Sequence, residues 1–509
     1  MKKEIVINYT QREIRIAILE DNELVEFLIE REESRRTVGG IYSGRINAVI
    51  PGIQAAFVDI GQERAAFLHV SDVATGALDP DLVDDVDFEV PSGRKRRDFP
   101  PIQNLLKKGQ EIVVQIKKEA ISTKGPRVSS QISLPGRYAV LMPNLDHIGI
   151  SKKIDNRKER NRLRAIIRKH RPKGSAVIVR TAGSGVEDQQ IKDDLKHLEK
   201  RWKEIERKIE RATPPALIHE DVDITVFALR DLFSEDVNQI TIDNKSEYER
   251  LSSYLKSFAP HLASRVKLYT DKVPLFDYYE IEAEIEKTLE SKIWVRKGGY
   301  IVIEHTEALV SIDVNTGRFT GKRNQEETIL ETNLIAAREI ARQLRLRDIG
   351  GIIVIDFIDM EREENRRKVY NEFRNAMRKD RSRARVSQIS DLGLIEVSRK
   401  RVRPSLLHYY SDECPYCVGS GKILSIESMA MKIEQWIRRI GVPGKIRGMQ
   451  FRVNPILGIY MREERDEFIR ELAERYRTIV EIIDDPRLHR EELEIRSLDG
   501  KRDLKGEFV

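Results

Sequence analysis

Two aspartates, Asp313 and Asp356, lie in or at the end of apolar runs with the composition of β-strands. A carboxylate in such a run is costly to bury without a partner, and carboxylate oxygens are ligands that suit Mg²⁺. A cation held there would lower the pKa of a bound water and stabilise charge that develops on a phosphate. Asn315 faces the same way as Asp313, because strand side chains alternate, and is placed to fix the water or the phosphate. The pattern predicts either a magnesium site for phosphate chemistry or, more plainly, two aspartates that cap turns or pair with arginines.

The elements around these residues form a strand, a helix and a strand in chain order. The apolar runs 300–305 and 308–315, joined by Thr306 and Glu307, predict an antiparallel strand pair. Residues 331–347 have the spacing of an amphipathic helix, and residues 350–360 predict a buried parallel strand followed by Asp359. This crossover is typical of an α/β layer, in which sites form at the carboxyl ends of strands.

Other hydrolytic chemistries find less support in the sequence. The nine histidines show no pairing by spacing, which disfavours acid–base cleavage through a ribose hydroxyl. The sequence has no GxxxxGK[ST] phosphate loop and no GxSxG nucleophile turn. Nucleotide hydrolysis and acyl transfer are therefore disfavoured.

The two cysteines of the chain, Cys414 and Cys417, form a CPYC motif. Two cysteines rule out a disulfide framework, and a structural zinc requires four ligands. A second copy of the chain would supply the other two, so that the metal joins protomers. The alternatives are a redox pair or one metal completed by His408. A redox pair usually begins a helix in a small α/β fold, and that context is not predicted here.

Length and composition predict a soluble, intracellular protein of several domains. The chain has 509 residues, 40% of them hydrophobic and 34% charged, with a net charge of +6. No run approaches the length of a membrane span, and the first residues lack a signal core. Basic residues gather in 151–180 and 361–403, which indicates either a polyanion partner or solvated helix faces.

Short strands with alternating polarity fill the first part of the chain. Residues 1–36 predict part of a sheet, and residues 40–70, punctuated by glycine and proline, predict a small closed barrel that resumes at 111–116. Barrels of this kind bind single-stranded nucleic acid by stacking bases on aromatic side chains. The candidates are Tyr42, Phe57 and Phe67, against the simpler interpretation that they fill the core. The charged stretch 79–97 predicts a flexible insertion without a fold signal.

The remaining segments predict further elements. Residues 186–211 are charged and helical and end at a break in 212–215, strands and helices mix in 221–278, and a helix-like segment covers 279–289. After the cysteines, five apolar residues fall at helical spacing and the run RTIVEII looks like a strand. The five are Met429, Ile433, Trp436, Ile437 and Ile440.

Taken together, the motifs resemble the ribonuclease E/G family of bacterial endoribonucleases, over nearly the whole chain. The segments that carry the resemblance include GRINAVIPGIQAAFVDIGQERAAFLHVSD, TKGPRVSSQISLPGRY, VIVRTAGSG, SIDVNTGRFTGKRN, EIARQLRLRDIGGIIVIDFIDM and ECPYCVGSGK. One CxxC is weak evidence, but the set in this order is specific.

The resemblance implies a multidomain α/β and α+β fold. In chain order it implies the first part of an RNase H-like subdomain (1–36), an S1-like OB barrel (37–126, with an insertion at 73–106), a 5′-sensing subdomain (127–215), the second RNase H-like part (216–285), a DNase I-like catalytic subdomain (286–400), a zinc link (401–424) and a small C-terminal α+β domain (425–509).

The resemblance also implies roles for individual residues. Asp313 and Asp356 match magnesium-binding aspartates, Asn315 an active-site asparagine, and Cys414 with Cys417 the cysteines of a zinc link between two protomers. The residues that match a pocket for a 5′-monophosphate are Arg180, Thr181, Gly125, Val128 and Arg383. Phe57 and Phe67 match barrel aromatics that hold RNA.

The activity implied is a Mg²⁺-dependent, single-strand-specific endoribonuclease of the cytoplasm. It would leave 5′-phosphate and 3′-hydroxyl ends, prefer 5′-monophosphorylated RNA, and act in rRNA and tRNA processing and in mRNA decay. The partners implied are single-stranded RNA and a second copy of the chain, as a dimer or a tetramer. The chain ends at Val509, so we expect no scaffold tail and no membrane-binding segment. The alternatives are a noncatalytic single-stranded RNA-binding protein and a DNA-directed phosphodiesterase.

Overall fold

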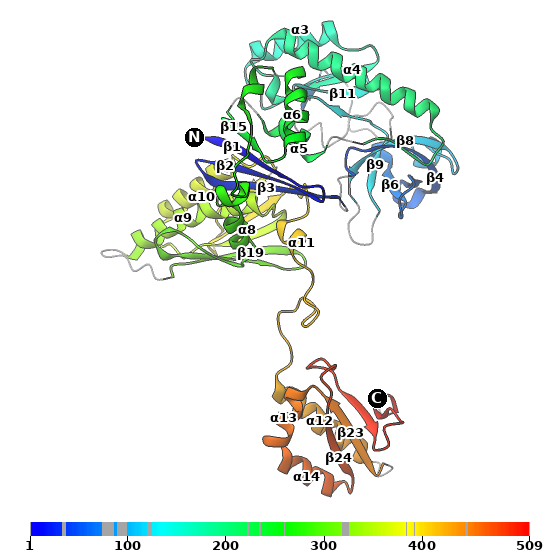
Figure 1. The fold of residues 1–509 in the computed structure, drawn as a ribbon, viewed down its shortest axis with the longest axis vertical. Helices are drawn as coiled ribbons and strands as arrows, with labels where there is room; N and C mark the ends of the chain where they lie inside the picture. The colour runs from blue at the N-terminus through cyan, green and yellow to red at the C-terminus, as the bar shows by residue number, and fades with distance from the viewer. Residues whose placement is uncertain are drawn as a thin grey trace. The chain divides into compact units, whose positions relative to one another are not determined.

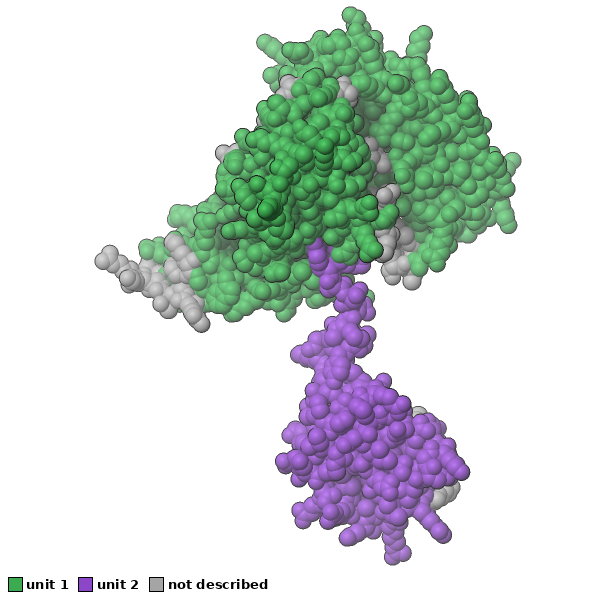
Figure 2. Space-filling view, in the orientation of Figure 1, with its two compact units in different colours: residues 1–407 green, residues 408–509 purple. Residues whose placement is uncertain are grey.

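The computed structural model contains two compact units, residues 1–407 and 408–509, coloured separately in Figure 2. It describes residues 2–32, 37–73, 86–88, 99–119, 125–220, 223–233, 236–258, 260–317, 325–382, 384–390, 392–442 and 446–507. Figure 1 labels the elements along the chain. No helix of this described part is both long and apolar enough to cross a membrane.

The first sheet contains the three strands predicted at the N-terminus, β1 (Lys3–Tyr9), β2 (Glu13–Glu20) and β3 (Glu23–Arg31). Asp21 and Asn22 both have positive φ, as a tight hairpin between β2 and β3 requires. Two later strands, β15 (Gln239–Ile242) and β16 (Val266–Leu268), extend the sheet in the order β16-β15-β1-β2-β3. β15 runs parallel to β1.

Helices between and after these strands complete the region. They are α5 (Ile224–Phe227), α6 (Lys245–Phe258), α7 (Leu275–Tyr278) and α8 (Ile281–Leu289). Leu251 and Leu255 of α6 share one core with Ile5, Ile7 and Ile240 of the sheet.

A closed barrel follows β3. Its strands are β4 (Ile41–Ile50), β5 (Ala55–Asp59), β6 (Ala66–His69), β8 (Glu111–Lys118) and β9 (Arg127–Ser129). β4 pairs with both β5 and β8, and β9 pairs with both β6 and β8, so the ring has no free edge. A short helix, α2 (Ile102–Leu105), precedes β8. β14 (Ala216–His219) pairs with the first three residues of β4, Ile41 to Ser43.

The third sheet has the order β10-β11-β13-β12-β7. Its strands are β10 (Leu134–Pro135), β11 (Ala139–Pro143), β12 (Ile148–Ser151), β13 (Ser175–Val179) and β7 (Val86–Phe88). Two helices, α3 (Arg157–His170) and α4 (Asp188–Arg211), bury Leu163, Ile167 and Leu195 in the same core. The prediction that 79–97 lacks a fold signal is wrong for β7, which pairs with β12; most of that stretch lies outside the described residues.

The fourth sheet contains the strand pair predicted around Asp313. Its order is β17-β18-β19-β20-β22-β21, from β17 (Lys292–Trp294), β18 (Tyr300–His305), β19 (Leu309–Asn315), β20 (Gly351–Asp356), β21 (Ala384–Val386) and β22 (Leu394–Arg399). β18 and β19 are antiparallel and β19 and β20 are parallel, as predicted.

Among the described residues, helices cover one face of this fourth sheet and leave the other without a helix. α9 (Gln325–Leu346) and α10 (Glu363–Met377) pack on it (Figure 1). Ile340 and Phe373 of these helices share one core with Ile353 and Ile355. The prediction of a buried strand at 350–360 is therefore half wrong, because Ile352 points to the other face and is 56% exposed. We call that other side the open face.

The chain passes into the second unit within α11 (Leu406–Tyr410). That unit has the sheet β24-β23-β25, with β23 (Gly448–Val453), β24 (Ile479–Asp484) and β25 (Glu494–Ser497). Its helices are α12 (Ile426–Gly441), α13 (Pro455–Glu463), α14 (Asp466–Arg475) and α15 (Leu504–Glu507). The helical spacing predicted after the cysteines is confirmed in α12, and the run RTIVEII overlaps β24.

Candidate active site

Asp313 and Asp356 are direct register partners on the parallel strands β19 and β20. Both side chains are exposed on the open face, while their neighbours Ile312 and Ile355 point into the core. Neighbouring strands lie about 4.8 Å apart, so the two carboxylates start from adjacent backbone positions. Asn315 shares their face and donates a hydrogen bond from Nδ2 to Asp313 Oδ2 at 2.7 Å. The structure thus brings these residues together.

The carboxylates repel one another without a neutralising partner. Partial burial, then the charges of Asp313 and Asp359, raises the pKa of Asp356. Within the described ranges, neither Asp313 nor Asp356 forms an ion pair with lysine or arginine. The interpretation that these aspartates pair with arginines therefore finds no support there. A bound cation would relieve the repulsion.

Asn333 holds the loop that follows Asp356, and sequence reasoning missed it. This side chain of α9 is fully buried; it donates to the carbonyl of Ile358 at 2.8 Å and accepts from its backbone N–H at 3.1 Å. Phe357 is also buried, so the two residues that directly follow Asp356 are both held in place. The available signal was a polar residue on the buried stripe of an otherwise apolar helix face.

The predicted phosphate-sensing residues lie in two places. Arg180 follows β13, donates to the carbonyl of Gly136 at 2.7 Å and forms an ion pair with Asp231. The hydroxyl of Thr181 lies 3.0 Å from that of Ser151. Arg180 is already paired with a carboxylate, so a phosphate there would have to compete with Asp231.

The other sensing candidates belong to the barrel segment. Packing alone explains a glycine at position 125, because an added Cβ would lie 2.1 Å from the carbonyl oxygen of Ala65. Val128 is fully buried in the barrel core, so its side chain cannot reach a ligand. Arg383 lies outside the described residues.

The barrel aromatics separate into one core residue and an outer pair. Tyr42 is 8% exposed and belongs to the barrel core, so the prediction that it stacks on bases is wrong. Phe57 and Phe67 are register partners on β5 and β6 and remain half-buried. Their ring centroids lie 5.9 Å apart with the planes at 69°. This pair therefore presents partly exposed aromatic surface on the barrel.

Cys414 and Cys417 lie in a turn of the second unit. Cys414 is exposed, and the backbone N–H of Cys417, then that of Tyr416 and the Cys417 thiol, lower the pKa of Cys414. The ring of Tyr416 stacks on His489 at 4.1 Å, which holds the turn against its own unit. In the described part, no group of three or more His, Cys, Asp or Glu side chains is arranged to hold a metal, so His408 does not complete a site with the two thiols.

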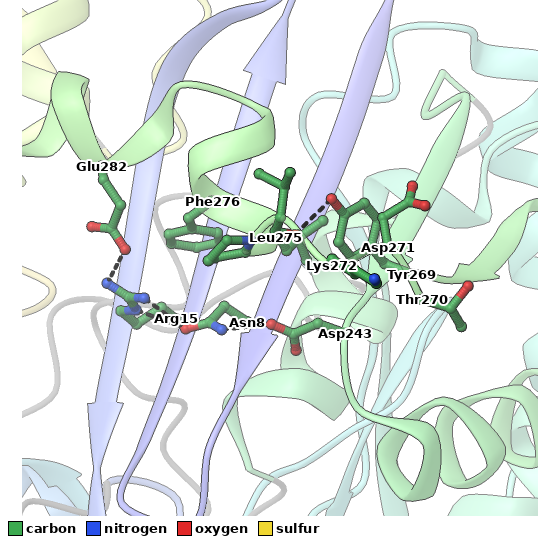
Figure 3. A pocket seen from close by; sticks show the side chains of 12 residues that line it. Asn8, Arg15, Asp243, Tyr269, Thr270, Asp271, Lys272, Leu275, Phe276 and Glu282 are labelled. Carbon is green, nitrogen blue, oxygen red and sulfur yellow. Dashed lines mark hydrogen bonds and ion pairs between the residues drawn. The ribbon is translucent and has the colours of Figure 1, made fainter.

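A cavity of about 340 Å³ lies in the first sheet region (Figure 3). Neither Asp313 nor Asp356 lines it. Asn8 donates to Asp243 at 2.5 Å, and Arg15 donates to Asn8 at 2.9 Å and pairs with Glu282 at 2.8 Å. The guanidinium of Arg15 also lies 4.6 Å from the centre of the Phe276 ring. Asn8, Arg15, Asp243 and Glu282 therefore satisfy one another's polar groups.

The sequence matches two protein-family models and several known ribonucleases. The model of the ribonuclease E/G family matches residues 133–402, and that of the RNase E/G thioredoxin-like domain matches residues 413–498. Ribonuclease G of Escherichia coli (strain K12) is 38% identical over 442 residues, 86% of this chain and 88% of that protein. Ribonuclease E of the same organism is 39% identical over 434 residues, 85% of this chain and 40% of that protein. Ribonuclease G of Haemophilus influenzae is 38% identical over 437 residues, which is 86% of this chain and 87% of that protein.

The chain is therefore an endoribonuclease, and it belongs to the ribonuclease E/G family. The predicted resemblance is confirmed. The mixed α/β fold of several parts, with a closed five-stranded barrel consistent with an OB fold, is confirmed as well.

The second family match bears on the cysteines. We did not predict a small α/β fold around them, but the model of a thioredoxin-like domain matches residues 413–498. The helix that a redox pair needs is nevertheless not at the thiols, because α12 begins only at Ile426.

Proposed function

We propose that this enzyme hydrolyses single-stranded RNA with a Mg²⁺ ion held by Asp313 and Asp356, leaving 5′-phosphate and 3′-hydroxyl ends. The observation that carries the proposal is the register pair of exposed carboxylates whose repulsion no cation of the described part relieves. Two hard oxygen ligands beside solvent fit an ion that keeps several waters and takes up substrate phosphate.

When bound, the metal would supply an activated water and offset the charge that develops on the phosphate. The residues of the chain have separate tasks. Asn315 holds the Asp313 carboxylate in place by its hydrogen bond, and Asn333 anchors the loop after Asp356. Burial and the neighbouring charges of Asp313 and Asp359 raise the pKa of Asp356, and a bound cation would favour its ionised form.

The parts of the fold suggest how RNA reaches this site. We assign the barrel to an S1-like OB fold that holds the strand on Phe57 and Phe67, the sheet β17–β22 to a DNase I-like catalytic subdomain, and the first sheet to an RNase H-like subdomain. Stacking on aromatics without a base-specific pattern suits single strands of any sequence. The work proposed for the enzyme is processing of rRNA and tRNA and decay of mRNA in the cytoplasm.

Arg180 and Thr181 are proposed to recognise a 5′-monophosphate. The support is a guanidinium beside a hydroxyl, with Asp231 as its present partner. Replacing Arg180 with Ala should abolish the preference for monophosphorylated over triphosphorylated RNA in a cleavage assay. Equal discrimination by the variant and the parent would leave Arg180 a packing role only.

Cys414 and Cys417 are proposed to bind Zn²⁺ jointly with the same pair of a second chain. Two thiolates are half of a tetrahedral set, and Cys414 is exposed. The assembly would be a dimer, or a tetramer of two dimers. Changing both cysteines to Ser should lower the mass measured by light scattering and remove the zinc measured by elemental analysis; an unchanged mass would refute the shared site.

One assay tests the catalytic proposal. A labelled strand is incubated as single-stranded RNA, as duplex RNA and as single-stranded DNA, with Mg²⁺ or with EDTA. We expect cleavage only of single-stranded RNA with Mg²⁺, and products that a ligase can join only through a 5′-phosphate. Cleavage that persists in EDTA contradicts the metal, and equal cleavage of DNA favours the DNA-directed alternative.

A further inference from the structure

Three side chains on the open face form a cluster that the catalytic proposal does not use. Lys292 and Trp294 come from β17 and Tyr300 from β18. Trp294 is 56% exposed, although large aromatic side chains are usually covered in a folded protein. We call these residues the aromatic cluster.

The cluster combines aromatic surface with a positive charge. The rings of Trp294 and Tyr300 lie 5.3 Å apart at 60°. The Nζ of Lys292 lies 4.6 Å from the centre of the Trp294 ring and 3.7 Å from that of Tyr300. Lys292 has no carboxylate partner in the described ranges, so its charge remains available to an anion.

Register places the cluster beside the carboxylates. Tyr300 is the direct partner of Asn315, and Trp294 is the direct partner of Tyr300. In the next row, Lys292 pairs with Val302, which pairs with Asp313. With strands about 4.8 Å apart, Tyr300 lies one spacing and Trp294 two spacings from β19, about 5 and 10 Å.

This combination fits a single-stranded nucleic acid better than a protein surface. Grooves that hold single strands place aromatic rings for the bases beside cations for the backbone. A protein partner would favour an apolar centre without charge, whereas here the lysine lies over the rings themselves.

We propose that a nucleobase next to the scissile phosphate stacks on Trp294, with Tyr300 beside it, while Lys292 contacts the RNA backbone. The cluster then positions the strand across Asp313 and Asp356 and sets where it is cut. This inference rests on the proposed function and adds a base-binding subsite to it.

Trp294 itself can report the stacking. The chain has three tryptophans, so changing Trp202 and Trp436 to Phe leaves Trp294 as the single emitter. Asp313→Asn is added to prevent cleavage, and the full chain is titrated with a single-stranded oligoribonucleotide while a dye on the RNA reports binding by anisotropy. We expect RNA binding to quench the Trp294 emission. The quenching should disappear when one nucleotide near the cleavage position is made abasic.

Two results would overturn the subsite. RNA that binds by anisotropy while the emission stays unchanged shows that no base stacks on Trp294. Emission that changes with protein concentration in the absence of RNA shows instead that the cluster lies between copies of the chain.

Kinetics in the cleaving enzyme give a second readout. Trp294→Ala should raise KM about tenfold with kcat within about threefold, because the lost stacking acts in binding, and Trp294→Phe should restore most of the affinity. Tyr278→Ala is the matched control, since Tyr278 is 60% exposed but lies in the first sheet region, and it should leave KM unchanged. An equal rise of KM in both variants contradicts the subsite.

The two proposals fail in distinguishable ways. If Asp313→Asn in the otherwise unchanged enzyme cleaves RNA at the parent rate, the catalytic proposal fails. If that variant is inactive but Trp294 emission does not respond to bound RNA, only the subsite fails.

Discussion

The parallel strand pairs β1–β15 and β19–β20 both end in polar residues, and the chemistry of the two ends differs. At the ends of β1 and β15, Asp243 accepts hydrogen bonds from the Asn8 side chain and the backbone N–H of Tyr9, and Arg15 pairs with Glu282 close by (Figure 3). At the ends of β19 and β20, Asp313 and Asp356 are adjacent without a neutralising partner in the described part.

The difference shows how one backbone geometry serves two purposes. In the first sheet the amide of Asn8 stands beside Asp243, so each polar atom finds a partner and the end of the sheet is held together. In the fourth sheet a second carboxylate stands beside Asp313, and the two repel each other. Carboxylates that remain mutually repelling mark a place where an external cation gains free energy by binding.

The largest contrast is expected in cleavage. Asp313→Asn should lower the rate at least about 10³-fold, because it removes a charge that holds the metal. Asp243→Asn is the matched change at the other strand end and should keep the rate within about threefold, at a cost of about 1 kcal/mol in stability. The measurements are initial cleavage rates and urea unfolding. A comparable loss of rate in Asp243→Asn would show that the first sheet also takes part in catalysis.

Thermal unfolding separates the two ends next. A ligand that binds only the folded state stabilises it by about 2.7 kcal/mol at a concentration one hundred times its Kd. Mg²⁺ should therefore raise the melting temperature of the parent and of Asp243→Asn, but not that of Asp313→Asn. Differential scanning fluorimetry with and without EDTA measures this. An equal rise in all three proteins would place the stabilising cation elsewhere.

Removing the hydrogen bonds between Asn333 and Ile358 should have an intermediate effect on the cleavage rate. Asn333→Ala leaves the backbone N–H and carbonyl of Ile358 without their partner, at a cost of about 1–3 kcal/mol in unfolding free energy. We expect a lower cleavage rate together with a higher Mg²⁺ concentration for half activity, because the Asp356 carboxylate loses its fixed position. A pure loss of stability with unchanged Mg²⁺ dependence would show that the loop is fixed by packing alone.

The smallest effect is expected in the pH dependence of stability without metal. Burial and the charges of Asp313 and Asp359 raise the pKa of Asp356 above its ordinary value of 3.8, so the folded state keeps a proton that the unfolded chain has released. The unfolding free energy should therefore fall as pH rises from about 4 through the raised pKa, and the loss is complete above it. Asp356→Asn cannot ionise and should show a smaller fall in urea unfolding with EDTA. Parallel curves for the two proteins would contradict the repulsion.

Local patterns predicted the strands of the fourth sheet better than what covers them. Strict alternation in 308–315 placed Asp313 and Asn315 on one face, and this is confirmed. The continuous apolar run 351–355 gave no sign that Ile352 would be exposed, because such a run has the same composition whether one or both faces are covered. The covering helices decide this, and they are distant in sequence.

Two side-chain contacts between segments far apart in the chain escaped prediction. Asp231 lies 51 positions from Arg180, and no spacing rule joins an arginine after one strand to an aspartate in another region. The same holds for Asn333 and Ile358, which lie 25 positions apart. Tyr42 was misassigned because alternation in a barrel strand does not tell inside from outside without the closure of the ring.

Because helices cover one face of the fourth sheet, the orientation of Asp356 is sensitive to the loss of a single residue from β20. Along β20, odd-numbered Ile353 and Ile355 face the helices and even-numbered Ile352 and Asp356 face solvent. Deleting a single residue between Gly351 and Asp356 would turn the carboxylate toward α9 and α10 and bring Phe357 beside Asp313. An in-frame deletion of one codon there would thus be more damaging than many substitutions, since it moves the following side chains to the opposite face of the sheet instead of altering one contact.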